Sequence, residues 1–361
     1  MKIFKKIIKT LLILICALVL AFVMLIIYLT ITEYKPDPVE SLTVESGAAE
    51  SDTGLLTGDA LTIVSWNVGY GALGDNADFF MDGGSHVYTA DKERLSENLS
   101  GIGTILSDLG PDIILLQETD IDSARSYHTD EFRYFMDMFP SFDGTFAYNY
   151  NARFVPFPLP PIGEVGSGLV TLSAYDIERS ERISLPCPFK WPVRVANLKR
   201  CLSVNRIPIE GSDKELVIIN LHLEAFDDGE GKAAQTKMLA DFLKNELESG
   251  NYIIAGGDFN QSFSGTDTSG CPELEGCWHS GILDESNFDS SLTFLQPSVP
   301  SGRSLDRPLE GVQDTDSFQF YIIDGFIISD NLTVISVETV NHGFKYTDHN
   351  PVVLKVVIDP E

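Results

Sequence analysis

The sequence has few basic side chains for its length. Its 361 residues include 25 lysines and arginines against 53 aspartates and glutamates, which gives a formal net charge of −28 at pH 7. A field of that sign repels nucleic acid and anionic lipid at long range. The charge balance therefore argues against a protein that grips a nucleic-acid duplex, although a local basic cleft stays compatible with it.

Cysteine is also scarce, with five in the chain, and no internal repeat is visible. Cys271 and Cys277 flank the polar segment Pro-Glu-Leu-Glu-Gly, so a small disulfide staple is compatible with an exported protein. A metal site is disfavoured there, because the spacing is not Cys-x2-Cys and His279 is the one nearby partner.

The longest apolar run lies at the N-terminus. Four lysines in residues 1–9 precede the uncharged stretch 10–32, which is long enough to span a bilayer as a helix. Glu33 is the first charge after it, so the positive-inside rule leaves a basic stub in the cytoplasm and exports the rest. A cleaved signal peptide is the alternative, but its apolar region is usually shorter. We expect a retained transmembrane helix and a location in the cell membrane.

The rest of the chain reads as a tether followed by one domain. Residues 33–60 are rich in proline, serine, glycine and acidic residues without apolar periodicity, which predicts a flexible tether. A hydrophobic content of 43% suits a sizeable core, and we assign residues 61–361 to a catalytic domain.

Strand-like and helix-like patterns alternate within that domain. Apolar residues at three- and four-residue spacing predict a helix over 95–109, with Asp91 near its start and Gly110 at its end, and a second helix over 238–247. Strands are predicted at 61–68, 112–116, 168–174, 201–209, 215–223, 252–255, 320–329, 332–340 and 351–358. Some strands follow one another directly, so mixed sheets with flanking helices fit better than a purely parallel fold. Residues 155–161 and 261–315 are predicted as long loops.

The segment Gly256-Gly257-Asp258-Phe259-Asn260 follows a short apolar run that reads as a buried strand. The two glycines suggest a sharp turn at the end of that strand. Asp258 and Asn260 are two residues apart, so in an extended chain they would point the same way. A carboxylate and an amide on one side suit a metal ion, an attacking water or a phosphoryl oxygen.

Other predicted strands also end in polar residues that a plain core would not contain. Each one singly has a structural explanation, such as a turn cap for Asn67 or a satisfied core histidine for His222. A series of six in order is harder to explain in that way, because ligands often gather where strand ends converge. The series is Ser65-Trp66-Asn67, Gln117-Glu118, Asn220-Leu221-His222, Asp258 with Asn260, Asp324, and Asp348-His349.

These motifs, in this order, resemble the endonuclease/exonuclease/phosphatase superfamily, which includes pancreatic-type deoxyribonucleases, abasic-site endonucleases, inositol polyphosphate 5-phosphatases and neutral sphingomyelinases. The segment Gly166–Ser173 also resembles a strand of that family, and the resemblance covers about residues 61 to 358. It implies an α/β four-layer sandwich, in which two mixed β-sheets pack face to face with helices outside. It also implies hydrolysis of a phosphodiester or phosphomonoester with Mg²⁺, or alternatively Mn²⁺, as the cofactor.

The resemblance also implies roles for the polar residues. Glu118 would bind the metal, and Asn67 and Asp348 would complete or support that site. Asp258 would orient or deprotonate the attacking water, and Asn260 would hold a phosphoryl oxygen.

The histidines have implied roles as well. His349 would contact the phosphoryl group or transfer a proton, and Asp324 would hold His349 in place. His222 would be a general acid or a phosphate contact, and it shifts weight away from the abasic-site branch.

The substrate stays open at this level. A loose basic cluster, Arg194, Lys199, Arg200 and Arg206, either lines a phosphate site or is solvated. The acidic surface and the membrane helix favour a small or lipid-linked phosphoester substrate. An extracellular nuclease acting on DNA or RNA is the alternative, and a catalytically inactive binding module of the same fold is the third possibility.

Overall fold

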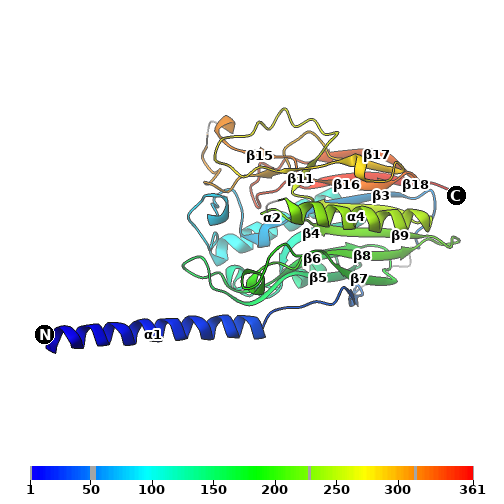
Figure 1. The fold of residues 1–361 in the computed structure, drawn as a ribbon. Helices are drawn as coiled ribbons and strands as arrows, with labels where there is room; N and C mark the ends of the chain where they lie inside the picture. Colours follow the sequence, from blue (N-terminus) through cyan, green and yellow to red (C-terminus); the bar gives the residue numbers. More distant parts are fainter. Residues whose placement is uncertain (1, 49–53, 227–228, 313–314, 361) are drawn as a thin grey trace.

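The computed structural model describes residues 2–48, 54–226, 229–312 and 315–360 (Figure 1). The predicted tether and the predicted loop 261–315 each include a few residues outside these ranges. The α-helices in the described residues are α1 (Lys2–Ile31), α2 (Lys92–Leu109), α3 (Glu131–Met138) and α4 (Glu230–Glu248).

Two seven-stranded mixed sheets form the body of the protein. Sheet A has the order β1 (Val39–Ser41), β7 (Arg179–Ser184), β8 (Cys201–Pro208), β9 (Glu215–His222), β10 (Tyr252–Asp258), β16 (Asp324–Ser329) and β13 (Leu292–Leu295). Sheet B has the order β17 (Leu332–Thr339), β18 (Val352–Ile358), β3 (Ala60–Asn67), β4 (Ile113–Asp120), β6 (Gly163–Ser173), β5 (Asp143–Val155) and β2 (Val44–Glu45). Two short pairs, β11 (Gln261–Phe263) with β12 (Gly281–Leu283) and β14 (Gly302–Arg303) with β15 (Phe320–Tyr321), lie beside them.

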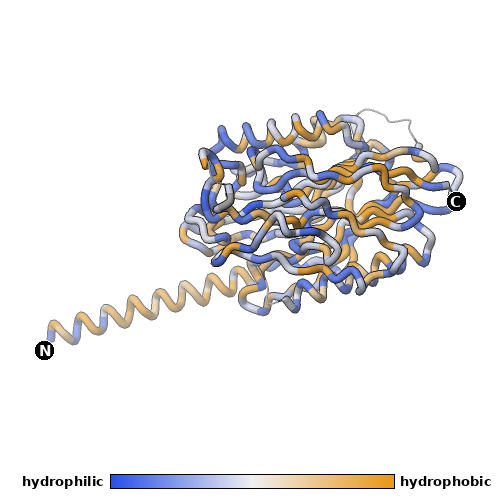
Figure 2. The backbone as a smooth tube through the Cα atoms, turned by 90° about the horizontal axis from the view of Figure 1, so that it is seen from above, coloured by the Kyte–Doolittle hydropathy of each residue, from blue (hydrophilic) through white to orange (hydrophobic). Residues whose placement is uncertain are grey.

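The layers follow from apolar residues on both faces of each sheet. Successive residues of a strand point to opposite faces, so Ile63 of β3 packs between the sheets while Val64 packs under α2 and α3. Sheet A repeats this arrangement, with Ile218 facing sheet B and Ile219 facing α4. Figure 2 shows these hydrophobic strands in the interior and the hydrophobic helix α1 outside. The predicted sandwich of two mixed sheets with flanking helices is confirmed.

The predicted helix boundaries have visible causes. Asp91 caps α2 by accepting a hydrogen bond from the Arg94 amide at 2.8 Å, and Gly110 ends the helix in the left-handed conformation at φ 57°. In contrast, α3, β5 and β7 were not predicted from the sequence.

The segment 261–315 differs from the prediction of one long loop. It contains β11, β12, β13 and β14, and β13 extends sheet A by pairing with β16. Short apolar runs such as Leu292–Leu295 are enough to pair when an existing strand edge is available, although they are too short to be recognised alone. Cys271 and Cys277 within this segment have free thiols.

The segment expected to be a flexible tether also differs from that expectation. Val39–Ser41 pair with β7 and Val44–Glu45 pair with β5, so this part of the chain adds an edge strand to each sheet. The sequence of this segment has no apolar pattern of its own. It pairs because the edge strand of each sheet has free backbone NH and carbonyl groups, which can form hydrogen bonds with an extended segment.

Candidate active site

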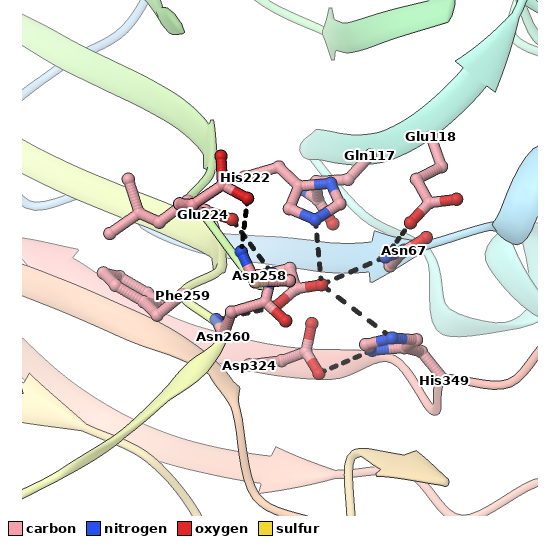
Figure 3. A network of polar contacts seen from close by, with 12 residues as sticks. Asn67, Gln117, Glu118, His222, Glu224, Asp258, Phe259, Asn260, Asp324 and His349 are labelled. Atoms are coloured by element: carbon pink, nitrogen blue, oxygen red, sulfur yellow. Dashed lines mark hydrogen bonds and ion pairs between the residues drawn. The ribbon is translucent and has the colours of Figure 1, made fainter. Parts of the chain in front are cut away.

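The polar strand ends meet at one end of the sandwich, between the two sheets (Figure 3). Asp258 at the end of β10 lies opposite His222 of the parallel strand β9 and opposite Asp324 of the antiparallel strand β16. In sheet B, Asn67 of β3 lies opposite Gln117 of β4. Strand register therefore fixes these side chains relative to one another.

A buried amide pair connects the sheets beneath this cluster. Gln117 donates from Nε2 to Asn220 Oδ1 at 2.8 Å, and Asn220 donates from Nδ2 to the carbonyls of Leu116 and Val170. Both amides are fully buried, so their hydrogen bonds hold sheets A and B in one register at the site.

Gly256 and Gly257 do not form the predicted turn. Both lie inside β10 and pair with neighbouring strands on both sides. Gly257 has φ 151°, and a Cβ at this position would lie 1.9 Å from the Leu221 carbonyl oxygen. Glycine is therefore required because the strands approach closely here, and the chain turns only after Asp258.

Asp258 is the centre of the cluster and is almost fully buried. Its Oδ2 lies 3.1 Å from Asn67 Nδ2, 3.4 Å from His222 Nε2 and 3.8 Å from His349 Nε2. Burial, reinforced by the charge of Asp324, raises the pKa of Asp258 to about 7. A carboxylate with such a pKa can exchange a proton near neutral pH.

Asn260 is close to Asp258 in the chain, but the two side chains do not point in the same direction. Its backbone NH donates to Asp258 Oδ1 at 2.8 Å, and its side-chain Nδ2 donates to the Leu223 carbonyl at 2.9 Å. The residue has φ 51°, so the chain is turned rather than extended at this point. The expectation of two side chains on one face of an extended segment was therefore wrong.

His349 and Asp324 form a tight pair. Nδ1 of His349 lies 2.8 Å from Asp324 Oδ2, and both residues are buried. Burial alone would lower the pKa of His349, but the Asp324 carboxylate raises it well above its ordinary value. The raised pKa favours the protonated form of His349, whose Nε2 lies 3.8 Å from Asp258 Oδ2.

His222 has the opposite electrostatics. Burial, together with the positive charge of Arg200, lowers its pKa well below the ordinary value. Arg200 donates to the His222 carbonyl at 3.0 Å and forms an ion pair with Glu224 at 3.5 Å. His222 is therefore a neutral imidazole at neutral pH, which makes it a weak general acid and a suitable hydrogen-bond partner.

Asn67, Glu118 and Asp348 lie together on the sheet B side of the cluster. Asn67 Nδ2 lies 3.1 Å from Glu118 Oε1, and the single proton of the Thr347 hydroxyl is within hydrogen-bond reach of two acceptors, the Asn67 carbonyl at 3.1 Å and Asp348 Oδ1 at 3.2 Å. Glu118 has φ 54° at a break in the register between β4 and β6, a strained conformation that a functional role would explain.

These residues fit a divalent cation. Glu118 and Asp348 provide hard carboxylate oxygens, and burial raises the pKa of Asp348 to about 6 despite the opposing charge of His349. A cation would relieve the cost of holding these buried carboxylates ionised together. The carboxylates of Asp258 and Asp324 and a nitrogen of His349, all within 4.8 Å of one another, form a second group that could hold a metal ion.

Three arginines near the cluster were not identified as a group from the sequence. Arg125 forms a bidentate ion pair with Asp120 and lies 3.5 Å over the Tyr70 ring, and both Arg200 and Arg303 are buried. All three line the same cavity. Only Arg200 belonged to the basic cluster recognised in the sequence. Arg206 pairs with Glu215 and Glu246, while Arg194 and Lys199 pair with Glu33.

The cluster lies at the floor of a cavity of about 390 Å³. Glu118, His222, Asp258, Asn260, Asp348 and His349 line the floor. The walls are largely apolar and aromatic, and they come from segments outside the strand ends. The wall residues include Phe79, Phe80, Met81, Tyr150, Phe157, Phe189, Leu198, Phe226, Trp278 and Tyr321.

Comparisons with known proteins agree with this geometry. The sequence profile of the Endonuclease/Exonuclease/phosphatase family matches residues 64–349. A search among curated proteins finds no match.

Similar solved structures support the same fold. An endonuclease/exonuclease/phosphatase from Beutenbergia cavernae shares 14% identity with a TM-score of 0.56, over 83% of this chain and 72% of its own. A family protein from Bacteroides thetaiotaomicron shares 16% identity with a TM-score of 0.54, over 83% and 96%. The catalytic domain of human Nocturnin, solved with a sulfate anion, shares 16% identity with a TM-score of 0.53, over 87% and 96%.

Proposed function

The chain belongs to the Endonuclease/Exonuclease/phosphatase family, and we propose that it is a membrane-anchored, metal-dependent phosphoesterase that uses water as the nucleophile. The observation that carries this proposal is the position of Asp258. Its Oδ2 is approached by Asn67 from sheet B, by His222 from sheet A and by His349 from the segment before β18. We propose that a phosphoryl group and its attacking water would meet next to this carboxylate.

Asn67, Glu118 and Asp348 would hold the cation, which we propose to be Mg²⁺ because the available ligands are hard oxygens. When bound, the cation supplies charge neutralisation at the phosphoryl oxygens. The second group of possible ligands is less suited to Mg²⁺, because His349 offers nitrogen and already pairs with Asp324.

The remaining side chains would carry the water and the protons. Asp258, with its pKa near 7, orients the water and accepts its proton. Cationic His349, held by Asp324, contacts the phosphoryl group and donates a proton to the leaving oxygen. Neutral His222 contacts a phosphoryl oxygen, and its lowered pKa favours this role over that of general acid. The Asn260 amide, which donates one hydrogen to the Leu223 carbonyl, would contact the same phosphoryl group with its remaining hydrogen.

The anchor is supported by α1. This helix is long and apolar enough to cross a membrane, and its apolar stretch is not buried in the protein. We propose that it is retained and that the domain lies outside the cell, since the lysines precede the helix. A tag placed before Met1 tests this: it should stay with the domain in the membrane fraction, whereas loss of the tag would indicate a cleaved signal sequence.

The proposed activity can be tested with the full chain in detergent micelles and a panel of substrates. The panel contains an aryl phosphodiester, an aryl phosphomonoester, plasmid DNA, RNA and a dispersed phospholipid, each with Mg²⁺ and with EDTA. We expect hydrolysis of at least one phosphoester, and loss of that activity in EDTA. Hydrolysis of none, or an undiminished rate in EDTA, would contradict the proposal. Faster hydrolysis of DNA or RNA than of all other substrates would establish the nuclease alternative.

A further inference from the structure

We propose that the loops around the mouth of the cavity contact the outer surface of the bilayer in which α1 is anchored, and that the substrate is a phospholipid of that leaflet. This inference rests on the proposed function and on the retention of α1. Three observations support it: the apolar walls of the cavity, the exposed apolar side chains at its mouth, and the attachment of α1 to one of the loops that form it.

The walls of the cavity suit a substrate with a large apolar part. The phosphoester would lie on the polar floor, next to Asp258 and His349, while the walls contribute Leu73, Phe79, Val155, Ile162 and Leu305. A highly charged soluble phosphate ester would leave these walls without a partner. A phospholipid matches both parts, because it joins a charged phosphodiester to acyl chains.

Exposed apolar side chains continue from the cavity to the protein surface. We define the apolar rim as Met81, Phe157 and Phe226, which line the cavity, together with Leu159, Trp191 and Val193, which lie in the same connections as the lining residues Phe157 and Phe189. Phe157 is 70% exposed and Leu159 is 82% exposed, and both lie in the connection between β5 and β6. Single exposed apolar residues are normal, but a group of them around one opening marks an interaction surface.

The C-terminal end of α1 is fastened to the rim. Trp191 donates from Nε1 to Thr30 Oγ1 at 3.1 Å, and Leu29 is packed to 4% exposure. Glu33, just after the helix, lies 3.2 Å from Arg194 Nε and 3.7 Å from Lys199 Nζ. We call these contacts the α1 clamp. Figure 1 shows the end of α1 next to the green loop that follows β7.

The clamp determines which surface faces the membrane. A flexible tether would let the domain turn freely, but here Val39–Ser41 are already paired with β7 only a few residues after the helix. A bilayer that contains α1 would therefore meet the apolar rim, with the cavity opening toward it. The net charge of −28 repels anionic lipid. We therefore propose that the apolar side chains of the rim contact a zwitterionic membrane surface.

The proposed reaction is a simple hydrolysis. The water gives a proton to Asp258 as its oxygen bonds to phosphorus, one P–O ester bond breaks, and the released alcohol oxygen takes a proton from His349. No oxidant, reductant or second substrate is required.

The experiment uses the full chain reconstituted into phosphatidylcholine vesicles with Mg²⁺, and phosphorus NMR to detect the product. The double variant Leu159→Asp with Val193→Asp places charges on the rim at two side chains that do not line the cavity, and Ile335→Asp is the matched control on β17, where the side chain is 56% exposed. We expect phosphatidylcholine turnover to fall at least tenfold in the rim variant and to stay unchanged in the control. Turnover of a soluble aryl phosphodiester should stay within about twofold in all three proteins.

Two results would overturn the inference while leaving the proposed function intact: aryl ester hydrolysis without phospholipid turnover, or equal phospholipid turnover in the rim variant and the wild type. Absence of aryl ester hydrolysis as well would instead refute the proposed function. A readout independent of activity is the quenching of tryptophan fluorescence by brominated phosphatidylcholine. We expect quenching that is lost in Trp191→Phe, and equal quenching in both proteins would refute the membrane contact.

Discussion

The floor and the rim of the cavity are built in opposite ways. Floor residues such as Asp258 and His222 are buried, come from adjacent strands and contact each other through polar atoms 3.4 Å apart. Rim residues such as Phe157 and Trp191 are exposed, apolar and carried by loops. In the proposed function, the strands of the two sheets would fix the positions of the reacting groups, while the loops would determine which phosphoester reaches them.

Removal of Glu118, the proposed metal ligand, should strongly weaken the response of the enzyme to Mg²⁺. We expect Glu118→Gln to raise the Mg²⁺ concentration for half-maximal rate more than about 100-fold, since even residues behind a metal ligand cost about 10- to 100-fold. A Mg²⁺ titration of aryl ester turnover measures this, with Glu338→Gln on β17 as the exposed control. An unchanged Mg²⁺ dependence would remove Glu118 from the metal site.

Asp324 should act on the floor through His349. We expect Asp324→Asn to lower kcat about 100-fold with little change in KM, because the Asp324 carboxylate raises the pKa of His349 and holds its ring. The pH–rate profile should also lose its activity at the alkaline end, since His349 would release its proton at lower pH. Asp330→Asn, just after the other end of β16, is the matched control. A loss of rate without a change in the profile would indicate a merely structural role.

The α1 clamp should have a smaller effect, confined to membrane substrates. We expect Glu33→Gln to lower phosphatidylcholine turnover about threefold and to leave aryl ester turnover unchanged. The reason is that Arg194 and Lys199, in the connection after β7, lose their ion-pair partner at the end of α1. Parallel assays on vesicles and on the soluble ester measure the two rates. An equal decrease in both rates would indicate that Glu33 stabilises the domain in general and does not orient it on the membrane.

His222 should have the smallest effect, on the pH dependence of stability. Its pKa is lowered in the folded state, so its contribution to stability is complete above about pH 6.5 and is lost as the pH falls toward the lowered pKa. Relative to His222→Gln, we expect the unfolding free energy of the wild type to fall with acidification by up to about 1.4 kcal/mol per pH unit. Denaturant unfolding between pH 7 and 5 measures the slopes, and His279→Gln is the exposed control. Equal slopes in wild type and His222→Gln would contradict the lowered pKa.

The sequence predicted the floor much better than the rim. Strands β3, β4, β9 and β10 are nearly continuous apolar runs, so each was recognised, and polar residues at their ends were conspicuous. Parallel strand ends meet at one edge of a sheet, which is why Asn67, Glu118, His222 and Asp258 are brought together in the structure.

The rim and the segment after α1 were not predictable in the same way. Arg125 and Phe157 reach the cavity from connections whose sequences have no periodic pattern, so only tertiary structure reveals their position. The pairing of Val39–Ser41 with β7 depends on a free sheet edge rather than on the local sequence, which suggested a tether. Strand β5 was missed because polar residues interrupt its alternation of buried and exposed positions.

Aryl phosphodiester hydrolysis by the wild type and by Asp258→Asn is the most direct test of the account. Both proteins would be assayed as full chains in micelles at saturating Mg²⁺, after equal thermal melting shows that both are folded. The account predicts a loss of at least about 1,000-fold in kcat for the variant, because Asp258 orients the water and accepts its proton. Equal rates in the two proteins would contradict the central role of Asp258 and, with it, the proposed site.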